Sequence, residues 1–335
     1  MTTAVIGEVL VDLVWRTGSQ SIVPIPGGSP ANVAVGLHRL GHPALLMTTW
    51  GDDPPGVLVR EYLDGTGVDF TRADSESGRT TLALAYVDPE TGAADYDFLA
   101  AWDPAALDVP DEVDLLHTGS LAVVVRPGAE RVLEACRRMR HRPGAAVAVD
   151  LNVRPGVQPD RAAYRKAVEE LLAVTDVVKA SDEDLTWLYP DRSPERSARE
   201  LLALGPRLLV LTRGGAGATG FAALGGSGAD GTDGTDGGGG ADRPSAVVGE
   251  IVEVSVPAPE VDVADTIGAG DAFQSSLLDG LASGEPGGTR RVRLPADRAE
   301  LAELLRTCVI AGALACRRPG AQPPTAGEIA AARAA

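Results

Sequence analysis

Asp271 stands in a segment that could carry out phosphoryl transfer, running from Asp265 to Phe273 (DTIGAGDAF) and followed by apolar residues at helical spacing. This pattern predicts a tight turn that opens a helix, whose first N–H groups lack partners and attract anions. A carboxylate beside an anion site is electrostatically unfavourable, so its presence there suggests a function. A general base that accepts the proton of the attacking hydroxyl is such a function. The alternative is that Asp271 only caps the helix. An aspartate with an ordinary pKa is ionised at neutral pH, so a base here needs no large pKa shift.

A second glycine-rich segment runs from Gly27 to Gly41 (GGSPANVAVGLHRLG). Its two leading glycines allow a ligand to approach the backbone, and Pro30 suits the first turn of a helix. Asn32 adds an uncharged hydrogen-bonding side chain to that turn. The two segments, in this order and separation, resemble the two signature motifs of the PfkB carbohydrate kinase family, also called the ribokinase family. The resemblance covers nearly the whole chain and implies ATP-dependent phosphorylation of the alcohol group of a sugar or related compound.

The resemblance also implies which residues bind the sugar. These are Asp12, Gly27, Gly28, Asn32 and Arg154. We expect Asp12 near the carboxyl end of the first strand, where a short acceptor suits a grip on sugar hydroxyls, although a simple turn aspartate is the alternative. Arg154 ends an Asp-x-Asn-x-Arg element that begins at Asp150 and is typical of fructokinases, and its guanidinium suits phosphate geometry; the alternative is a surface arginine. The Gly7-Glu8 opening and the segment 117–121 also resemble the fructokinase subset.

The nucleotide site is expected around residues 211–217 (LTRGGAG), with Thr212, Gly214 and Gly217 near the ATP phosphates and ribose. The amides of Gly268, Ala269 and Gly270 are predicted to stabilise charge on the transferring phosphoryl group. The resemblance gives Asp265 the task of ordering this loop, in the family sometimes beside a monovalent cation such as K⁺. A G-x-G-x-x-G match at 215–220 is rejected as a dinucleotide motif because no helix follows it.

The magnesium position departs from the family pattern. Relatives typically have Asn-x-x-Glu, which positions the water shell of the Mg²⁺ that accompanies ATP, whereas this chain has Ser181 and Asp184 at that spacing. A serine three residues before an acid also resembles a capping box for the following helix. Both interpretations of Asp184 stay open, and Glu183 is a second candidate for the magnesium role.

Strand and helix patterns alternate along the chain, beginning with a strand over Ala4–Val14 and a helix over Pro30–Leu40. Such alternation predicts an α/β fold, a ribokinase-like doubly wound and mostly parallel sheet with helices on both faces and ligands at the carboxyl ends of the strands. Segments at about 15–26 and 79–102 are expected to form a small β-lid that excludes water. Residues 225–242, rich in glycine and aspartate, are expected to form a flexible loop.

Composition limits the classes of partner. The 335 residues suffice for one kinase domain over 1–335, and a net charge of −17 disfavours nucleic acid and anionic membranes. The absence of a basic leader at the start, and three cysteines that lie far apart or inside helical patterns, predict a cytoplasmic protein with reduced thiols. The expected partners are a small-molecule sugar and ATP, with a homodimer through the lid as a further expectation.

The acceptor is the least determined feature. Fructose, phosphorylated at a primary hydroxyl, is the first choice because of the fructokinase-like elements. The alternatives are 2-keto-3-deoxygluconate, ribose, a sugar phosphate or a nucleoside. A sugar-responsive regulator without catalysis is disfavoured, because Asp271 and its glycine turn are present.

Overall fold

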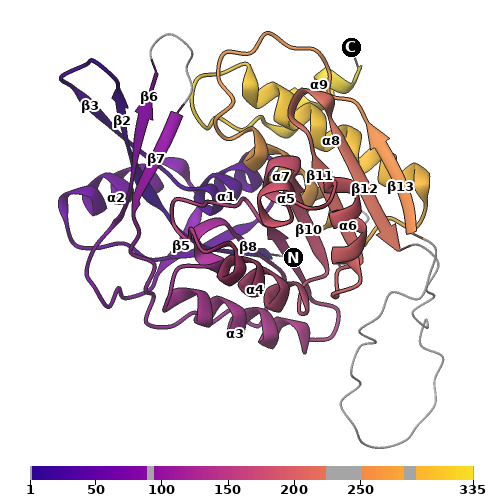
Figure 1. The fold of residues 1–335 in the computed structure, drawn as a ribbon, viewed down its shortest axis with the longest axis horizontal. Helices are drawn as coiled ribbons and strands as arrows, with labels where there is room; N and C mark the ends of the chain where they lie inside the picture. The colour runs from indigo at the N-terminus through magenta and orange to yellow at the C-terminus, as the bar shows by residue number, and fades with distance from the viewer. Residues whose placement is uncertain (1, 89–93, 224–250, 283–291, 335) are drawn as a thin grey trace, which may run out of the picture.

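Two sheets of different size make up the molecule, whose computed structural model describes residues 2–88, 94–223, 251–282 and 292–334 (Figure 1). The predicted loop at 225–242 lies outside these residues. Within them, the larger sheet has nine strands in the order β13 (Ile251–Val256), β12 (Ala218–Ala223), β11 (Leu208–Thr212), β10 (Val177–Ser181), β9 (Ala146–Asp150), β8 (Val113–Gly119), β1 (Thr2–Ile6), β4 (Ala44–Thr48) and β5 (Asp69–Arg72).

All strand pairs from β11 to β5 are parallel, and β12 and β13 add an antiparallel edge. The central strands are buried on both faces, so they consist of nearly continuous apolar residues. In β1, for example, Ala4 and Ile6 pack into one core and Val5 into the other.

Helices cover both faces of this sheet. One core is closed by α3 (Gly128–Arg140), α4 (Arg161–Leu172), α5 (Asp182–Leu188) and α6 (Pro194–Leu202). The other is closed by α1 (Ser29–Arg39), α2 (Pro54–Thr66), α7 (Ala269–Leu281) and α8 (Arg298–Cys316), and α9 (Ala326–Ala334) contacts α8. Short 3₁₀ turns η1 (Ser120–Val123) and η2 (Gly214–Ala216) follow β8 and β11. The described helices include none with the length and apolar character to cross a membrane. The predicted doubly wound fold is confirmed.

The smaller sheet, which we call the lid, stands beside the larger one (Figure 1). Its order is β3 (Ile22–Gly27), β2 (Leu10–Arg16), β6 (Thr81–Val87) and β7 (Ala94–Leu99). The predicted single strand over Ala4–Val14 is wrong, because β1 ends at Ile6 and the chain then passes from the larger sheet to the lid, where β2 begins at Leu10. Gly7 follows the end of β1. A Cβ on Gly7 would lie 2.2 Å from Cγ of Pro30, so only glycine allows the backbone to pass this close to Pro30. Asp12 therefore lies inside a lid strand and not near the end of a core strand.

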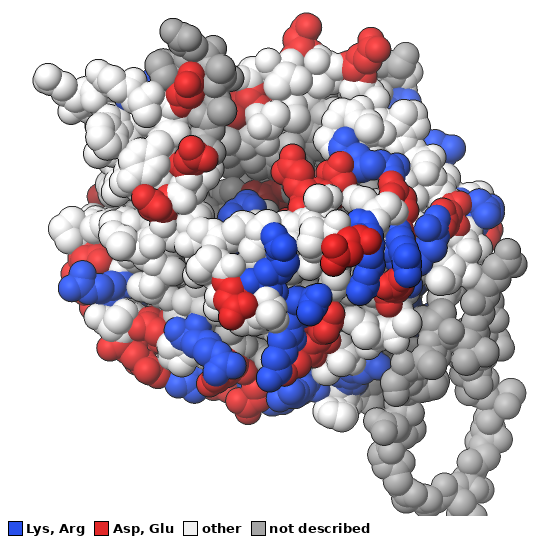
Figure 2. Space-filling view, in the orientation of Figure 1, with Lys and Arg blue, Asp and Glu red and all other residues white. Residues whose placement is uncertain are grey.

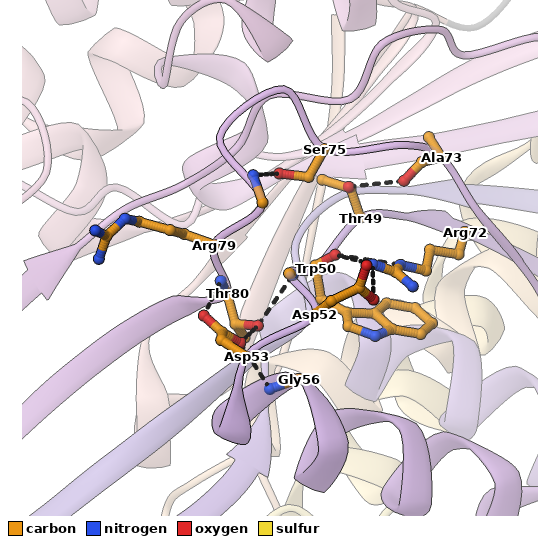
Figure 3. Close-up of polar contacts among 12 residues, drawn as sticks. Thr49, Trp50, Asp52, Asp53, Gly56, Arg72, Ala73, Ser75, Arg79 and Thr80 are labelled. Carbon is orange, nitrogen blue, oxygen red and sulfur yellow. Dashed lines mark hydrogen bonds and ion pairs between the residues drawn. The ribbon is translucent and has the colours of Figure 1, made fainter.

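Asp53 connects the lid to the larger sheet and its helices, which we call the body (Figure 3). It is the N-cap of α2 and accepts a hydrogen bond from the Gly56 N–H at 3.0 Å. Its carboxylate also accepts the N–H of Thr80 at 2.9 Å and the Thr80 hydroxyl, immediately before β6 begins. Desolvation opposes ionisation of Asp53, but the hydrogen bonds from Thr80 and Gly56 outweigh it and lower its pKa. One half-buried carboxylate thus fixes both a body helix and the base of the lid.

Candidate active site

A cleft of about 930 Å³ lies between the lid and the carboxyl ends of the parallel strands. Figure 2 shows this hollow, with acidic side chains gathered at its rim. Ten of the residues predicted from the sequence line it: Asp12, Gly28, Asn32, Arg154, Glu183, Asp184, Thr212, Gly268, Gly270 and Asp271. The other predicted residues, Gly27, Gly214, Gly217, Asp265 and Ala269, lie outside the lining. The fold therefore brings together residues that are up to about 260 positions apart in the chain.

The start of α7 forms one wall of the cleft. Gly268 precedes the helix with a φ of 75°, and a Cβ there would lie 2.8 Å from Cα of Ala321, so both the turn and its packing require glycine. Ala269 uses its N–H within the turn, donating to the carbonyl of Thr266 at 3.2 Å. The N–H groups of Gly268 and Gly270 have no hydrogen-bond partner among the described residues. Of the three amides predicted to bind the phosphoryl group, these two are therefore free for a ligand.

Asp271 is fixed by the start of α1. Its Oδ1 accepts a hydrogen bond from the Ser29 hydroxyl at 2.7 Å, and its Oδ2 accepts one from Nδ2 of Asn32 at 2.8 Å. The N-cap of α7 is Gly268, so the alternative in which Asp271 only caps the helix is excluded. Desolvation raises the pKa of Asp271, against the lowering effect of the bonds from Ser29 and Asn32. The sequence argument assumed that Asp271 has an ordinary pKa, whereas the protein that surrounds this carboxylate raises its pKa.

Glu8, Asp12 and Arg154 are charged residues at the lid end of the cleft, where Asp95 of β7 also lines it. Asp12 lies opposite Ile25 in the lid, and a Cβ on Gly27 would lie only 3.1 Å from its Oδ2. Desolvation raises the pKa of Asp12 to about 6, and the charge of Arg154 opposes this shift. Glu8 is 1% exposed, its Oε2 has no partner in the described structure, and desolvation raises its pKa to about 7. This end can therefore accept hydrogen bonds from several hydroxyls.

Asp184 has a structural task. Its Oδ2 accepts the N–H of Ser181 at 2.8 Å while the Ser181 hydroxyl accepts the N–H of Asp184, which completes the capping box of α5. Its Oδ1 accepts the N–H of Val153 at 2.7 Å and so supports the backbone before Arg154. Desolvation and the nearby Asp150 raise the pKa of Asp184. The capping interpretation is present in the structure, whereas the magnesium role stays a prediction.

The donor set fits a magnesium ion that is held mainly by nucleotide. Among the described residues, no group of three or more His, Cys, Asp or Glu side chains could hold a metal. Mg²⁺ commonly keeps several waters and binds one or two carboxylates together with substrate phosphates. Glu183 is exposed on the cleft, which matches that arrangement, whereas both carboxylate oxygens of the neighbouring Asp184 already accept backbone N–H groups.

The predicted nucleotide loop follows β11, where Thr212 reaches the cleft. Gly217 has a φ of 94°, and a Cβ there would lie 2.1 Å from the carbonyl oxygen of Val256, so chain packing alone requires this glycine. Asp265 accepts the N–H of Ile267 at 3.0 Å and that of Gly320 at 2.8 Å. It thereby orders the turn before α7 and joins it to the C-terminal loop.

Sequence reasoning gave no role to three residues that line the cleft. Ser29 stands inside the first motif and is the partner of Asp271. Glu8 belongs to the Gly-Glu pair that was noted only as a resemblance. Lys179 is 5% exposed, and its Nζ lies 2.6 Å from Oδ2 of Asp150. The signal for Lys179 was its rarity, because the chain contains only two lysines.

The comparisons with known proteins identify the family of the chain. The chain matches the family described as pfkB family carbohydrate kinase over residues 2–233 and 239–326. It is 30% identical to a fructokinase of Klebsiella pneumoniae over 326 residues, which cover 95% of this chain and 94% of that protein. It is 29% identical to a fructokinase of Rhizobium leguminosarum bv. trifolii over 285 residues, covering 82% and 78%.

A solved structure shares the fold. The crystal structure of a fructokinase with bound ATP from Xylella fastidiosa superposes with a TM-score of 0.77 at 24% identity, over 98% of this chain and 97% of that one. At this identity the likeness supports the fold alone, whereas the family match spans most of the sequence. The chain belongs to the pfkB family of carbohydrate kinases and is an ATP-dependent kinase that phosphorylates a sugar.

Proposed function

We propose that the chain transfers the γ-phosphoryl group of ATP to a primary hydroxyl of fructose, with Asp271 as the general base. The hydroxyl oxygen forms a bond to the γ-phosphorus while the bond from that phosphorus to the bridging oxygen breaks. ADP leaves with the electron pair, and the hydroxyl proton passes to Asp271. The observation that carries this proposal is the orientation of Asp271 by Ser29 and Asn32 at the amino end of α7.

The glycine turn supplies the complementary charge. The free amides of Gly268 and Gly270 point to a site for the oxygens of the transferring phosphoryl group, where preorganised donors stabilise the developing charge. Their neighbour Ala269 shapes the turn through its own bond to Thr266. We assign the phosphates and ribose to the region of Thr212, Gly214 and Gly217.

Fructose is favoured by the chemistry of the lid end and by the fructokinases among the relatives. Asp12 and Glu8 are carboxylates suited to accept hydrogen bonds from neutral hydroxyls, and Arg154 is the only cation beside them among the residues lining the cleft. We also assign Gly27, Gly28 and Asn32 to the acceptor site. A Cβ on Gly27 would lie 3.1 Å from Oδ2 of Asp12, a Cβ on Gly28 would lie 2.7 Å from the carbonyl oxygen of Glu8, and Asn32 retains an unpartnered Oδ1 in the described structure.

The test is a panel of acceptors assayed for ADP release, each with the parent protein and with Asp271→Asn. We expect fructose to give the highest kcat/KM and the substitution to lower kcat roughly 10²- to 10⁴-fold, which is the usual contribution of general-base catalysis. ATP affinity should stay nearly constant, because the geometry survives. A variant that retained more than about a tenth of the parent kcat would disprove the base assignment.

The second candidate acceptor is 2-keto-3-deoxygluconate, which the guanidinium of Arg154 favours because it can pair a carboxylate. The two acceptors differ in charge, so ionic strength separates them. The KM of the anionic acceptor should rise with added salt, whereas that of fructose should not. A higher kcat/KM for the keto acid would overturn the choice of fructose and leave the kinase activity intact.

We also propose the surroundings of the reaction. A Mg²⁺ ion on the ATP phosphates is placed near Glu183 and Asp184, and a monovalent cation such as K⁺ beside the loop that Asp265 orders. Exposed apolar side chains on the lid, among them Ile22, Val23 and Leu99, favour a homodimer through that sheet. Cytoplasmic location stays a prediction.

A further inference from the structure

Lys179 is a buried cation that the reaction described so far does not use. It lies on β10, lines the cleft and is 5% exposed. Among the described residues, the one hydrogen-bond partner of its ammonium group is Oδ2 of Asp150 at 2.6 Å, so two of the three N–H donors of that group are free. Oδ1 of Asp150 is buried and also has no partner there. Burying an ion pair costs several kcal/mol per ion, so such a pair is weak evidence for a purely stabilising role.

The position of the ammonium group is defined by the glycine turn. A Cβ built on Gly270 would lie 3.6 Å from Nζ of Lys179, which places the charge directly beside the first turn of α7. The absence of a side chain at Gly270 keeps the space between the free amides and Lys179 open. An anion bound to the amides of Gly268 and Gly270 would thus meet the ammonium group at the same place.

The two cations of the cleft act at different ends of it. Only Arg154 and Lys179 carry positive charge among the described residues that line it. The charge of Arg154 acts on Glu8 and Asp12, at the lid end. The charge of Lys179 acts on Asp271 and Asp184, at the end where the phosphates would lie. The other charged residues among the described residues that line it are carboxylates, which repel a nucleotide, so its phosphate end requires a cation.

We propose that Lys179 is a catalytic residue that binds an oxygen of the terminal phosphate of ATP, and that Asp150 is a positioning residue that holds its ammonium group. The inference rests on the kinase activity but not on the identity of the acceptor. The ammonium group of Lys179 donates hydrogen bonds to the phosphoryl group as the bond to ADP breaks. A charge-assisted bond of this kind strengthens as negative charge develops.

The test compares binding of two nucleotides by calorimetry, with Mg²⁺ in excess and no acceptor present. The non-hydrolysable analogue AMP-PNP has the terminal phosphate, and ADP lacks it. For Lys179→Met we expect AMP-PNP affinity to fall about ten- to a hundredfold, with less than about a threefold change for ADP. The control is Lys166→Met, because Lys166 is the other lysine of the chain, is 78% exposed on α4 and, within the part of the chain that the structure describes, pairs only with Glu170 across 3.9 Å.

A purely structural role predicts different results. It would lower the thermal midpoint and leave the ratio of the two affinities unchanged, and this result in folded protein would overturn the proposal. Because Lys179→Met leaves the Asp150 charge unpaired, the double variant with Asp150→Asn removes both charges and is measured in parallel under the same criterion. Failure of both variants to fold would make the pair a requirement of the fold and would also count against the proposal.

Activity gives an independent readout. With the best acceptor, Lys179→Met should lower kcat roughly 10²- to 10³-fold, as for loss of one transition-state donor. Lys179→Arg keeps the charge and should recover part of the loss. Because nucleotide binding needs neither the acceptor nor Asp271, a wrong choice of fructose or of the base would leave the binding result unaffected.

Discussion

Replacing Asp53 with alanine should lower the free energy of unfolding by more than the loss of a helix cap explains, because Asp53 also connects the lid to the body. The parent carboxylate accepts three hydrogen bonds, from the Gly56 N–H and from the N–H and hydroxyl of Thr80. Loss of an N-cap costs about 1 kcal/mol. The two bonds to Thr80 add about 1 kcal/mol each at a half-buried site, since hydrogen bonds to charged groups are stronger than neutral ones. We therefore expect a loss of about 2 to 3 kcal/mol in the free energy of unfolding.

Asp160→Ala is the matched control, because Asp160 caps α4 and its carboxylate accepts, among the described residues, only the N–H groups of Ala162 and Ala163. Both variants are compared with the parent by urea denaturation at pH 7, and the KM for the acceptor is measured alongside. We expect Asp53→Ala to lose at least about 1 kcal/mol more than the control and to raise the acceptor KM. Equal losses would refute the idea that Asp53 binds the lid to the body.

The pH dependence of the same variant has a definite sign. The folded pKa of Asp53 is lowered, so its contribution is fully present above the unfolded pKa and is lost as the pH falls through the folded pKa. The difference between parent and Asp53→Ala should stay constant above about pH 5 and shrink below about pH 4.

The remaining predictions concern other cleft carboxylates. The pKa of Glu8 is raised from 4.5 to about 7, so its ionisation destabilises the fold as the pH rises through this range. Glu8→Gln should therefore gain up to about 3 kcal/mol on the parent between pH 5 and pH 8, and a difference that stays flat across these pH values would contradict the argument. Asp184→Asn should lower stability by about 1 to 2 kcal/mol, because it breaks the capping box and the bond to Val153. Glu183→Gln should leave thermal stability unchanged, and a shift in the magnesium dependence of its rate tests the predicted metal role; an unchanged curve would argue against it.

The sequence was sufficient for the fold and for the glycine turn before α7, because both depend on local chemistry. Alternating apolar segments predict a parallel sheet, and glycines before Asp271 predict the turn at α7. The separation of β1 from β2 was not predictable, since the need for glycine at position 7 comes from its contact with Pro30, which exists only in the folded chain. For the same reason the pattern placed Asp12 in the wrong kind of strand.

Electrostatic features were harder to predict than positions. The raised pKa of Asp271 depends on how much protein surrounds the carboxylate, and no local pattern encodes that. The pairing of Lys179 with Asp150 joins residues on neighbouring strands whose order in the sheet had to be known first. The two interpretations of Asp184 also differ only in where its oxygens point, which the structure supplies.

The parallel pairing of β2 with β6 has a consequence for the order of folding. Leu10 pairs with Thr81, so the lid can form only after two distant parts of the chain have been brought together. Closing such a loop costs entropy before any contact compensates, and pairings of high sequence separation are slow. The body closes this loop, because it brings the start of β2 beside the start of β6, where Asp53 binds Thr80. The chain is thus expected to complete its phosphate-binding end first and to gain its acceptor site in the last step of folding.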